Sequence, residues 1–200
     1  MSRPRDPFAH ALDDLRGRLA EGRFPAGRPI VIADEARTLQ LSTTPVREAL
    51  CWLGGEGLIE RGGAGGFVAP RLDASLVAQR YALRRLYLMQ TQGHAVEPPP
   101  SGLIVEAAPA DRLRATWRWR VRAIGDAALA DAYDRLQGHL ARFRAAEARL
   151  FADLDAEAET LLADAGGGSS EAITGYHARR VSAAPMIAVS AESDSPEARS

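Results

Sequence analysis

Residues 1–70 restrict the fold most, because short helical patterns there are followed at once by a glycine-rich turn. Apolar side chains recur every three or four positions from Phe8 to Leu19, which predicts a helix. A second short helix is predicted over residues 33–39. The pair Thr44-Pro45 predicts the start of a third helix, with threonine as the cap and proline at the first helical position. Residues 58–70 hold two short apolar runs around five residues rich in glycine, which predicts a hairpin, so the whole pattern predicts a winged helix-turn-helix.

The rest of the chain is predicted to be helical. Residues 75–92 carry a broad apolar stripe that includes Leu83 but not Arg84. Residues 103–122 stay open between strand and helix, since the apolar positions from residue 112 onward fit both templates. Residues 126–164 predict one long or kinked helix, and residues 171–184 predict a last one.

These patterns predict a mainly α protein. Its parts are a winged helix-turn-helix of three helices and a β-hairpin over residues 1–72, an all-helical domain for dimerisation and effector binding over residues 73–185, and a disordered tail over residues 186–200.

Charge, cysteine content and the lack of long apolar runs limit the kinds of partner and location that we expect for this protein. The chain holds 25 Lys or Arg and 26 Asp or Glu, and residues 1–70 are balanced, so any nucleic-acid contact must come from local clusters. The one cysteine, Cys51, is expected to be a small buried side chain. No apolar run approaches the length of a membrane span and no signal peptide is recognisable at the start, from which we expect a cytoplasmic protein with no membrane partner.

The segment from Leu41 to Leu50, followed by Glu56 to Arg61 and Gly66 to Pro70, resembles the DNA-binding signature of the GntR family of transcriptional regulators. The resemblance implies a homodimeric repressor or activator that binds two half-sites of a palindromic double-stranded DNA operator. The residues predicted to bind DNA are Arg37, Ser42, Thr43, Thr44, Pro45, Arg47, Arg61 and Gly63.

The chemistry of these positions agrees with that role. The N-terminus of a recognition helix attracts a phosphate, to which the hydroxyls of Ser42 and Thr44 add hydrogen bonds. Arg47 could pair bidentately with guanine, and the glycine-rich wing beside Arg61 could approach the DNA backbone closely. From the residues alone, the hydroxyls are equally helix caps and Arg47 a solvated charge.

Two departures from the family pattern motivate another hypothesis. Thr43 stands where the family commonly has arginine, and Ala33 stands where it often has a basic residue. The alternative is therefore a helical dimerisation or partner-binding protein that retains the winged-helix fold but has lost tight, sequence-specific DNA binding.

The second half resembles, more weakly, the ligand-sensing FCD domain of the FadR branch of the family. That domain often binds a metal through an acid and three histidines, but Trp117 and residues 158–159 stand where two of these histidines are expected, and His177 alone remains. We expect no metal and no cofactor, because one imidazole is too few ligands. A small carboxylate effector held by Arg118, Arg120 and His177 is the resulting hypothesis.

No catalytic motif is recognisable, so no catalytic residue is assigned and an enzyme is not expected. A small enzyme that uses the Trp-Arg segment as a pocket is the remaining alternative.

Overall fold

The computed structural model describes residues 6–63, 65–97, 99–100, 107–164 and 167–192. They form two compact units. Of the described residues, the first unit comprises 6–72, 141–143 and 189–192, and the second lies within Asp73–Leu140 and Arg144–Ala188. We call residues 6–72 the winged unit and the second unit the helical unit.

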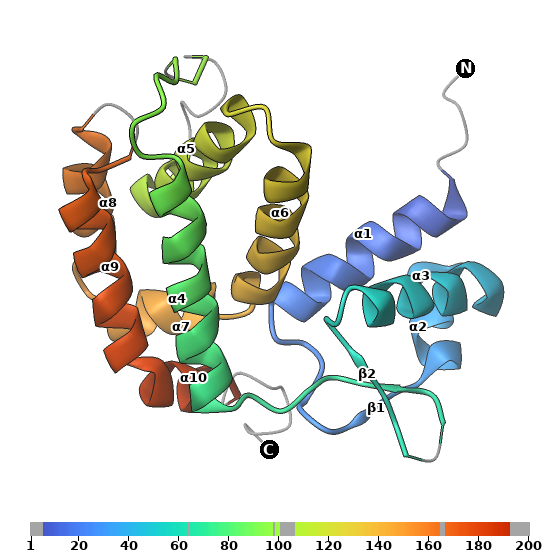
Figure 1. Cartoon of the computed structure of the whole chain (residues 1–200). Coiled ribbons are helices and arrows are strands. Elements are labelled where there is room, and N and C mark those ends of the chain that lie inside the picture. Colours follow the sequence, from blue (N-terminus) through green and yellow to red (C-terminus); the bar gives the residue numbers. More distant parts are fainter. Residues whose placement is uncertain (1–5, 64, 98, 101–106, 165–166, 193–200) are drawn as a thin grey trace. The chain divides into compact units, whose positions relative to one another are not determined.

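The winged unit contains three helices and a small sheet (Figure 1). The helices are α1 (Pro7–Ala20), α2 (Ile32–Leu39) and α3 (Thr43–Gly55), and the strands are β1 (Pro29–Ile30), β2 (Glu60–Arg61) and β3 (Phe67–Val68). The sheet is antiparallel in the order β1-β3-β2, with Phe67 opposite both Ile30 and Arg61. The predicted winged helix-turn-helix is confirmed, and β1 adds a third strand to the predicted hairpin.

The start of α3 differs from the prediction. The helix begins at Thr43, and Ser42 takes the cap position without a side-chain hydrogen bond to the backbone. Pro45 is therefore the third helical residue instead of the first. It still costs no hydrogen bond, because the first four N–H groups of a helix have no partner within it.

The turn between α2 and α3 depends on Gln40, which ends α2 in the left-handed conformation with φ of 56°. Its N–H and that of Leu41 donate to carbonyl groups of the last turn of α2, which closes the helix end. This tight turn fixes where α3 begins relative to α2.

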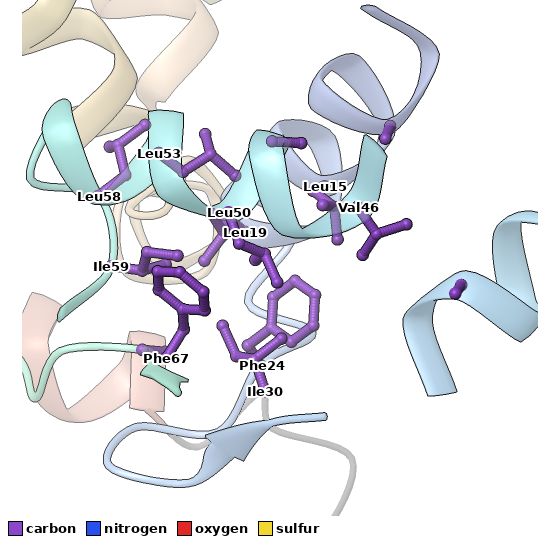
Figure 2. Packing of buried hydrophobic residues seen from close by; sticks show 14 residues of the cluster. Leu15, Leu19, Phe24, Ile30, Val46, Leu50, Leu53, Leu58, Ile59 and Phe67 are labelled. Atoms are coloured by element: carbon purple, nitrogen blue, oxygen red, sulfur yellow. The ribbon is translucent and has the colours of Figure 1, made fainter. Parts of the chain in front are cut away.

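One apolar core holds the winged unit together (Figure 2). Leu15 of α1 is fully buried, as are Val46 and Leu50 of α3. Phe24 and Phe67 extend the core toward the sheet. One side of α3 is thereby buried, which leaves its other side to solvent.

The helical unit is built from α4 (Ala74–Gln90), α5 (Pro109–Ala123), α6 (Ala127–Ala141), α7 (Arg144–Leu150), α8 (Leu154–Leu162), α9 (Ser170–Ser182) and much of α10 (Ala184–Glu192). The predicted all-helical second part is confirmed.

Three predictions for this unit need correction or completion. Residues 109–123 are helical, whereas residues 103–106 lie outside the described residues. The predicted single helix over residues 126–164 is wrong, since the chain breaks near Phe143 and Phe151, and both phenylalanines are buried at the turns. The predicted tail is helical to Glu192, and residues 193–200 lie outside the described part.

The core of the helical unit surrounds Trp117, which is fully buried. Its indole Nε1 donates a hydrogen bond to the carbonyl oxygen of Gly167 over 2.7 Å. A Cβ at Gly167 would lie 2.7 Å from that nitrogen, and the residue has φ of +83°. Glycine is therefore needed there for two reasons, space and backbone conformation.

Within the described part of the chain, no helix combines the length and apolar character that crossing a membrane requires.

Candidate functional site

The exposed face of α3 carries most of the predicted DNA-binding residues. Ser42, Thr43, Thr44 and Arg47 are exposed, and Pro45 is half-buried. Ser42 does not use its hydroxyl as a cap, so the side chain is available to a ligand. Arg47 forms no hydrogen bond or ion pair with any described residue. The N-terminal half of α3 thus presents hydroxyls and one unpaired guanidinium to solvent.

Arg37 and the wing are arranged differently. Arg37 lies in the last turn of α2, where its Nη1 is 3.0 Å from Oδ1 of Asp34. Both side chains are more than half exposed, so this ion pair is weak and could open for a phosphate. Arg61 lies on β2 with its guanidinium 4.8 Å from the centre of the Phe67 ring, and Gly63 is exposed in the turn that follows.

Most other arginines of the winged unit are paired with its own acids. Arg16 binds both carboxylate oxygens of Glu56, at 2.8 and 2.9 Å, and Arg18 pairs with Glu35. Arg23 lies 2.8 Å from Glu21. These pairs explain why balanced total charge is compatible with a free cation on α3.

A pocket of about 460 Å³ opens between the end of α3 and the sheet, with Cys51, Arg61 and Phe67 in its wall. Cys51 is exposed, so the expectation of a buried thiol was wrong. Its Sγ lies 3.9 Å from Nη2 of Arg61. The side chain follows Arg47 by one helical turn and therefore lies on the solvent side of α3.

The three predicted effector residues have different surroundings in the structure. Arg118 is exposed and binds both carboxylate oxygens of Asp134, at 2.7 and 3.0 Å. The charged residue that acts on the pKa of Arg120 is Asp164. His177 is fully buried, and the charges that act on its pKa belong to Arg84, Arg180 and Arg85.

The partner of His177 is Arg84, which sequence reasoning missed. Nε of Arg84, on α4, donates a hydrogen bond to Nε2 of His177 over 2.9 Å. Nδ1 of His177 lies 2.6 Å from the carbonyl oxygen of Ile173. Because Nε2 accepts, the imidazole proton is on Nδ1 and is donated to Ile173. Burial, helped by the charge of Arg84, lowers the pKa of His177 well below its usual value, so the ring is neutral.

Aromatic rings enclose the guanidinium of Arg84. Its central carbon lies 5.2 Å from the ring centre of Tyr81, 5.3 Å from Trp117 and 5.5 Å from Tyr176. The side chain is 2% exposed, and its Nη2 has no hydrogen-bond acceptor among the described residues. Arg84 is therefore a buried cation with one donor unsatisfied and no paired carboxylate.

A second buried arginine, Arg180 of α9, is fully paired. Its Nε donates to Glu147 over 2.8 Å and its Nη2 to Glu157 over 2.9 Å. The hydroxyl of Tyr81 also donates to Glu147, over 3.0 Å. These hydrogen bonds link α4, α7, α8 and α9. The charge of Arg180 is compensated by carboxylates, whereas no carboxylate among the described residues compensates Arg84.

Metal-ligating side chains do not gather elsewhere. No group of three or more His, Cys, Asp or Glu side chains lies close enough to hold an ion within the residues that the structure describes. The expectation of no metal stays a prediction, which the hydrogen bonds at both nitrogens of His177 support.

The described residues thus have the fold of a winged helix-turn-helix joined to an all-helical unit. Two solved structures share it. McbR/YncC from E. coli matches with a TM-score of 0.60 and 16% identity, over 92% of this chain and 97% of its own. A protein of Rhodococcus sp. RHA1, described as a transcriptional regulator GntR, matches with a TM-score of 0.68 and 16% identity, over 90% and 96%. No family model matches the chain, and no curated protein does. At 16% identity, this structural similarity establishes the fold alone, because proteins that share a fold can differ in activity.

Proposed function

We propose that this protein is a DNA-binding transcriptional regulator of the GntR type, which binds two half-sites of a palindromic operator as a homodimer. The observation that carries the proposal is the exposed N-terminal half of α3, where Thr43, Thr44 and an unpaired Arg47 face solvent within a winged-helix fold. The sequence motif from Leu41 to Leu50 supports the same assignment.

The mechanism assigns one task to each group. Free N–H groups at the start of α3 and the hydroxyls of Ser42 and Thr44 bind a phosphate, which sets the position of the helix on the duplex. Arg47 reaches a base edge and pairs with N7 and O6 of guanine. Arg61 and Gly63 bring the wing against the DNA backbone.

Selection of DNA from a random pool by the full-length protein tests the proposal. We expect enrichment of a two-fold symmetric motif, and we expect Arg47→Ala to lose preference at one base pair in each half-site. Arg23→Ala, on an exposed arginine away from α3 that pairs with Glu21, is the matched control and should select the wild-type motif. A pool that stays random after repeated rounds with the wild-type protein would contradict the proposal.

The second candidate is a partner-binding protein without tight DNA binding. It is favoured by the internal pairing of Arg16, Arg18 and Arg23, which leaves few cations for phosphates. This candidate gains support if the pool stays random while a folded protein is shown by circular dichroism.

Within the proposed function, a small carboxylate regulates the protein from the helical unit, and Arg84 replaces Arg118 and Arg120 as the residue that binds it. A buried guanidinium without a carboxylate is costly, so an anion that reaches its free Nη2 would be bound strongly. The neutral His177 holds the guanidinium in place from the other side.

Thermal-shift measurements with a panel of small mono- and dicarboxylic acids test this regulation. A stabilising acid should lose its effect in Arg84→Met and keep it in Arg118→Ala, whose side chain pairs with Asp134 at the surface. The reverse pattern would restore the site predicted from the sequence.

A further inference from the structure

The helical phase of α3 decides which side chains occupy the centre of its exposed face. The buried residues of α3 are Val46, Ala49, Leu50 and Leu53. At about 100° of rotation per residue, the direction opposite their mean passes between Thr44 and Glu48, each within about 30° of it. Arg47 lies about 70° to one side. A helix that enters a groove with this face foremost therefore leads with Thr44 and Glu48 in its N-terminal half, followed one turn later by Cys51.

Glu48 is an exposed carboxylate without a partner among the described residues. Three other acids of the winged unit, Glu21, Glu35 and Glu56, each pair with an arginine, whereas Asp13 and Glu60 are, like Glu48, exposed and unpaired among the described residues. Arg47, next to Glu48 in sequence, does not pair with it. The exposed face of α3 thus carries an unpaired negative charge. Such a charge would only weaken binding if the helix contacted phosphates alone.

A carboxylate on a DNA-facing helix is repelled by phosphates and gains only from a hydrogen-bond donor. In the major groove, cytosine offers such a donor through its N4 amino group, whereas thymine offers the O4 acceptor in its place. Adenine also has an amino donor, at N6, but the N7 acceptor beside it repels a carboxylate. A thymine there would leave two acceptors facing each other in a partly desolvated groove, which is unfavourable. The charge therefore rejects wrong bases as well as accepting a right one.

We propose that Glu48 determines specificity, selecting cytosine at a major-groove position next to the base read by Arg47. This inference rests on the proposed DNA-binding function. It also assigns the two neighbouring charges complementary tasks, since a guanidinium matches the acceptors of guanine and a carboxylate matches the donor of cytosine.

The test compares the wild-type protein with Glu48→Gln in DNA selection and in titrations of the selected operator. Because Glu48 is exposed and unpaired, the substitution should leave the fold unchanged, which circular dichroism checks. For the wild type, replacing the proposed cytosine with thymine should weaken binding about 10-fold or more. For Glu48→Gln the same replacement should matter less than about 3-fold, and affinity for unrelated DNA should rise because a charge that repels phosphates is gone.

The outcomes separate the two claims. A wild-type motif with a required cytosine that Glu48→Gln no longer requires supports the inference. An identical motif for both proteins overturns the role of Glu48 and leaves DNA binding intact. If the wild type enriches no motif, the proposed function fails and the inference fails with it.

Discussion

Arg84 and His177 lie 93 positions apart in the sequence, and a hydrogen bond of 2.9 Å from Nε of the arginine to Nε2 of the histidine joins them inside the helical unit. The bond uses the lone pair that a metal ion would need. Within the part of the chain that the structure describes, no carboxylate pairs with the positive charge of Arg84. The proposed effector chemistry and the first two predictions depend on this relationship.

The first prediction concerns metal content. Protein purified without chelator should contain no stoichiometric zinc, nickel or manganese by elemental analysis, because both nitrogens of His177 are hydrogen-bonded and a single imidazole is an insufficient ligand set. About one equivalent of metal per chain, lost in His177→Ala, would contradict the account.

The second prediction concerns pH. Burial and the charge of Arg84 depress the pKa of His177 in the folded state, so the unfolded chain binds a proton at His177 more readily than the folded one. Stability from this residue is therefore complete above its unfolded pKa, about 6.5, and declines as pH falls below it, by up to about 1.4 kcal/mol per pH unit.

Urea unfolding at pH 7.5 and 5.5 measures this effect. His177→Gln keeps a side-chain acceptor for Arg84 but does not titrate, so its free energy of unfolding should change less between the two pH values than that of the wild type. Equal changes in the two proteins would show that His177 is not the titrating group.

The third prediction concerns the buried pair of Arg180 and Glu147. Glu147→Gln should lower the free energy of unfolding by up to about 3–5 kcal/mol, because it removes the more deeply buried of the two carboxylates that pair with a fully buried guanidinium. Asp153→Asn is the control, since it removes an exposed partner of Arg179 and should change stability little. Similar losses of free energy of unfolding in both variants would contradict the prediction that a buried ion pair contributes more to stability than an exposed one.

The fourth prediction concerns Gly167. Gly167→Ala should destabilise the protein by about 1–3 kcal/mol, because the new Cβ meets the Trp117 indole and the backbone φ is positive. Gly175→Ala, in α9 with open space around the position, should be neutral or stabilise by about 0.5–1 kcal/mol. Chemical denaturation of the two variants gives the comparison, and a neutral Gly167→Ala would contradict the described packing.

The local fold could be predicted where a helical stripe coincides with a buried face. Leu113, Trp117 and Val121 are buried on one side of α5, whereas Trp119, an apolar residue that fits only the strand template, is half-buried and donates to the carbonyl oxygen of Glu97. The apolar residue at position 119 thus made the sequence alternate like a strand, although its side chain contacts Glu97 and is not part of the buried side of α5.

The candidate sites were predictable only in part. The exposed residues of α3 follow from a local motif. The pairing of Arg84 with His177 does not, since no spacing rule links distant helices and an arginine outside the apolar stripe is expected in solvent. Leu83, placed in that stripe by the pattern, is in fact exposed, because α4 turns Arg84 and Tyr81 inward. The helix breaks at Phe143 and Phe151 could not be predicted either, because the sequence has no glycine or proline at these turns.

The central claim is that α3 reads DNA sequence through Arg47. Its most direct test is the ratio of dissociation constants for the selected operator and for scrambled DNA of the same composition, measured at one salt concentration for the wild type and Arg47→Ala. We expect Arg47→Ala to weaken operator binding by about 1–3 kcal/mol and binding to scrambled DNA much less, so that the specificity ratio falls. An equal loss on both DNAs, or no loss on either, would contradict it.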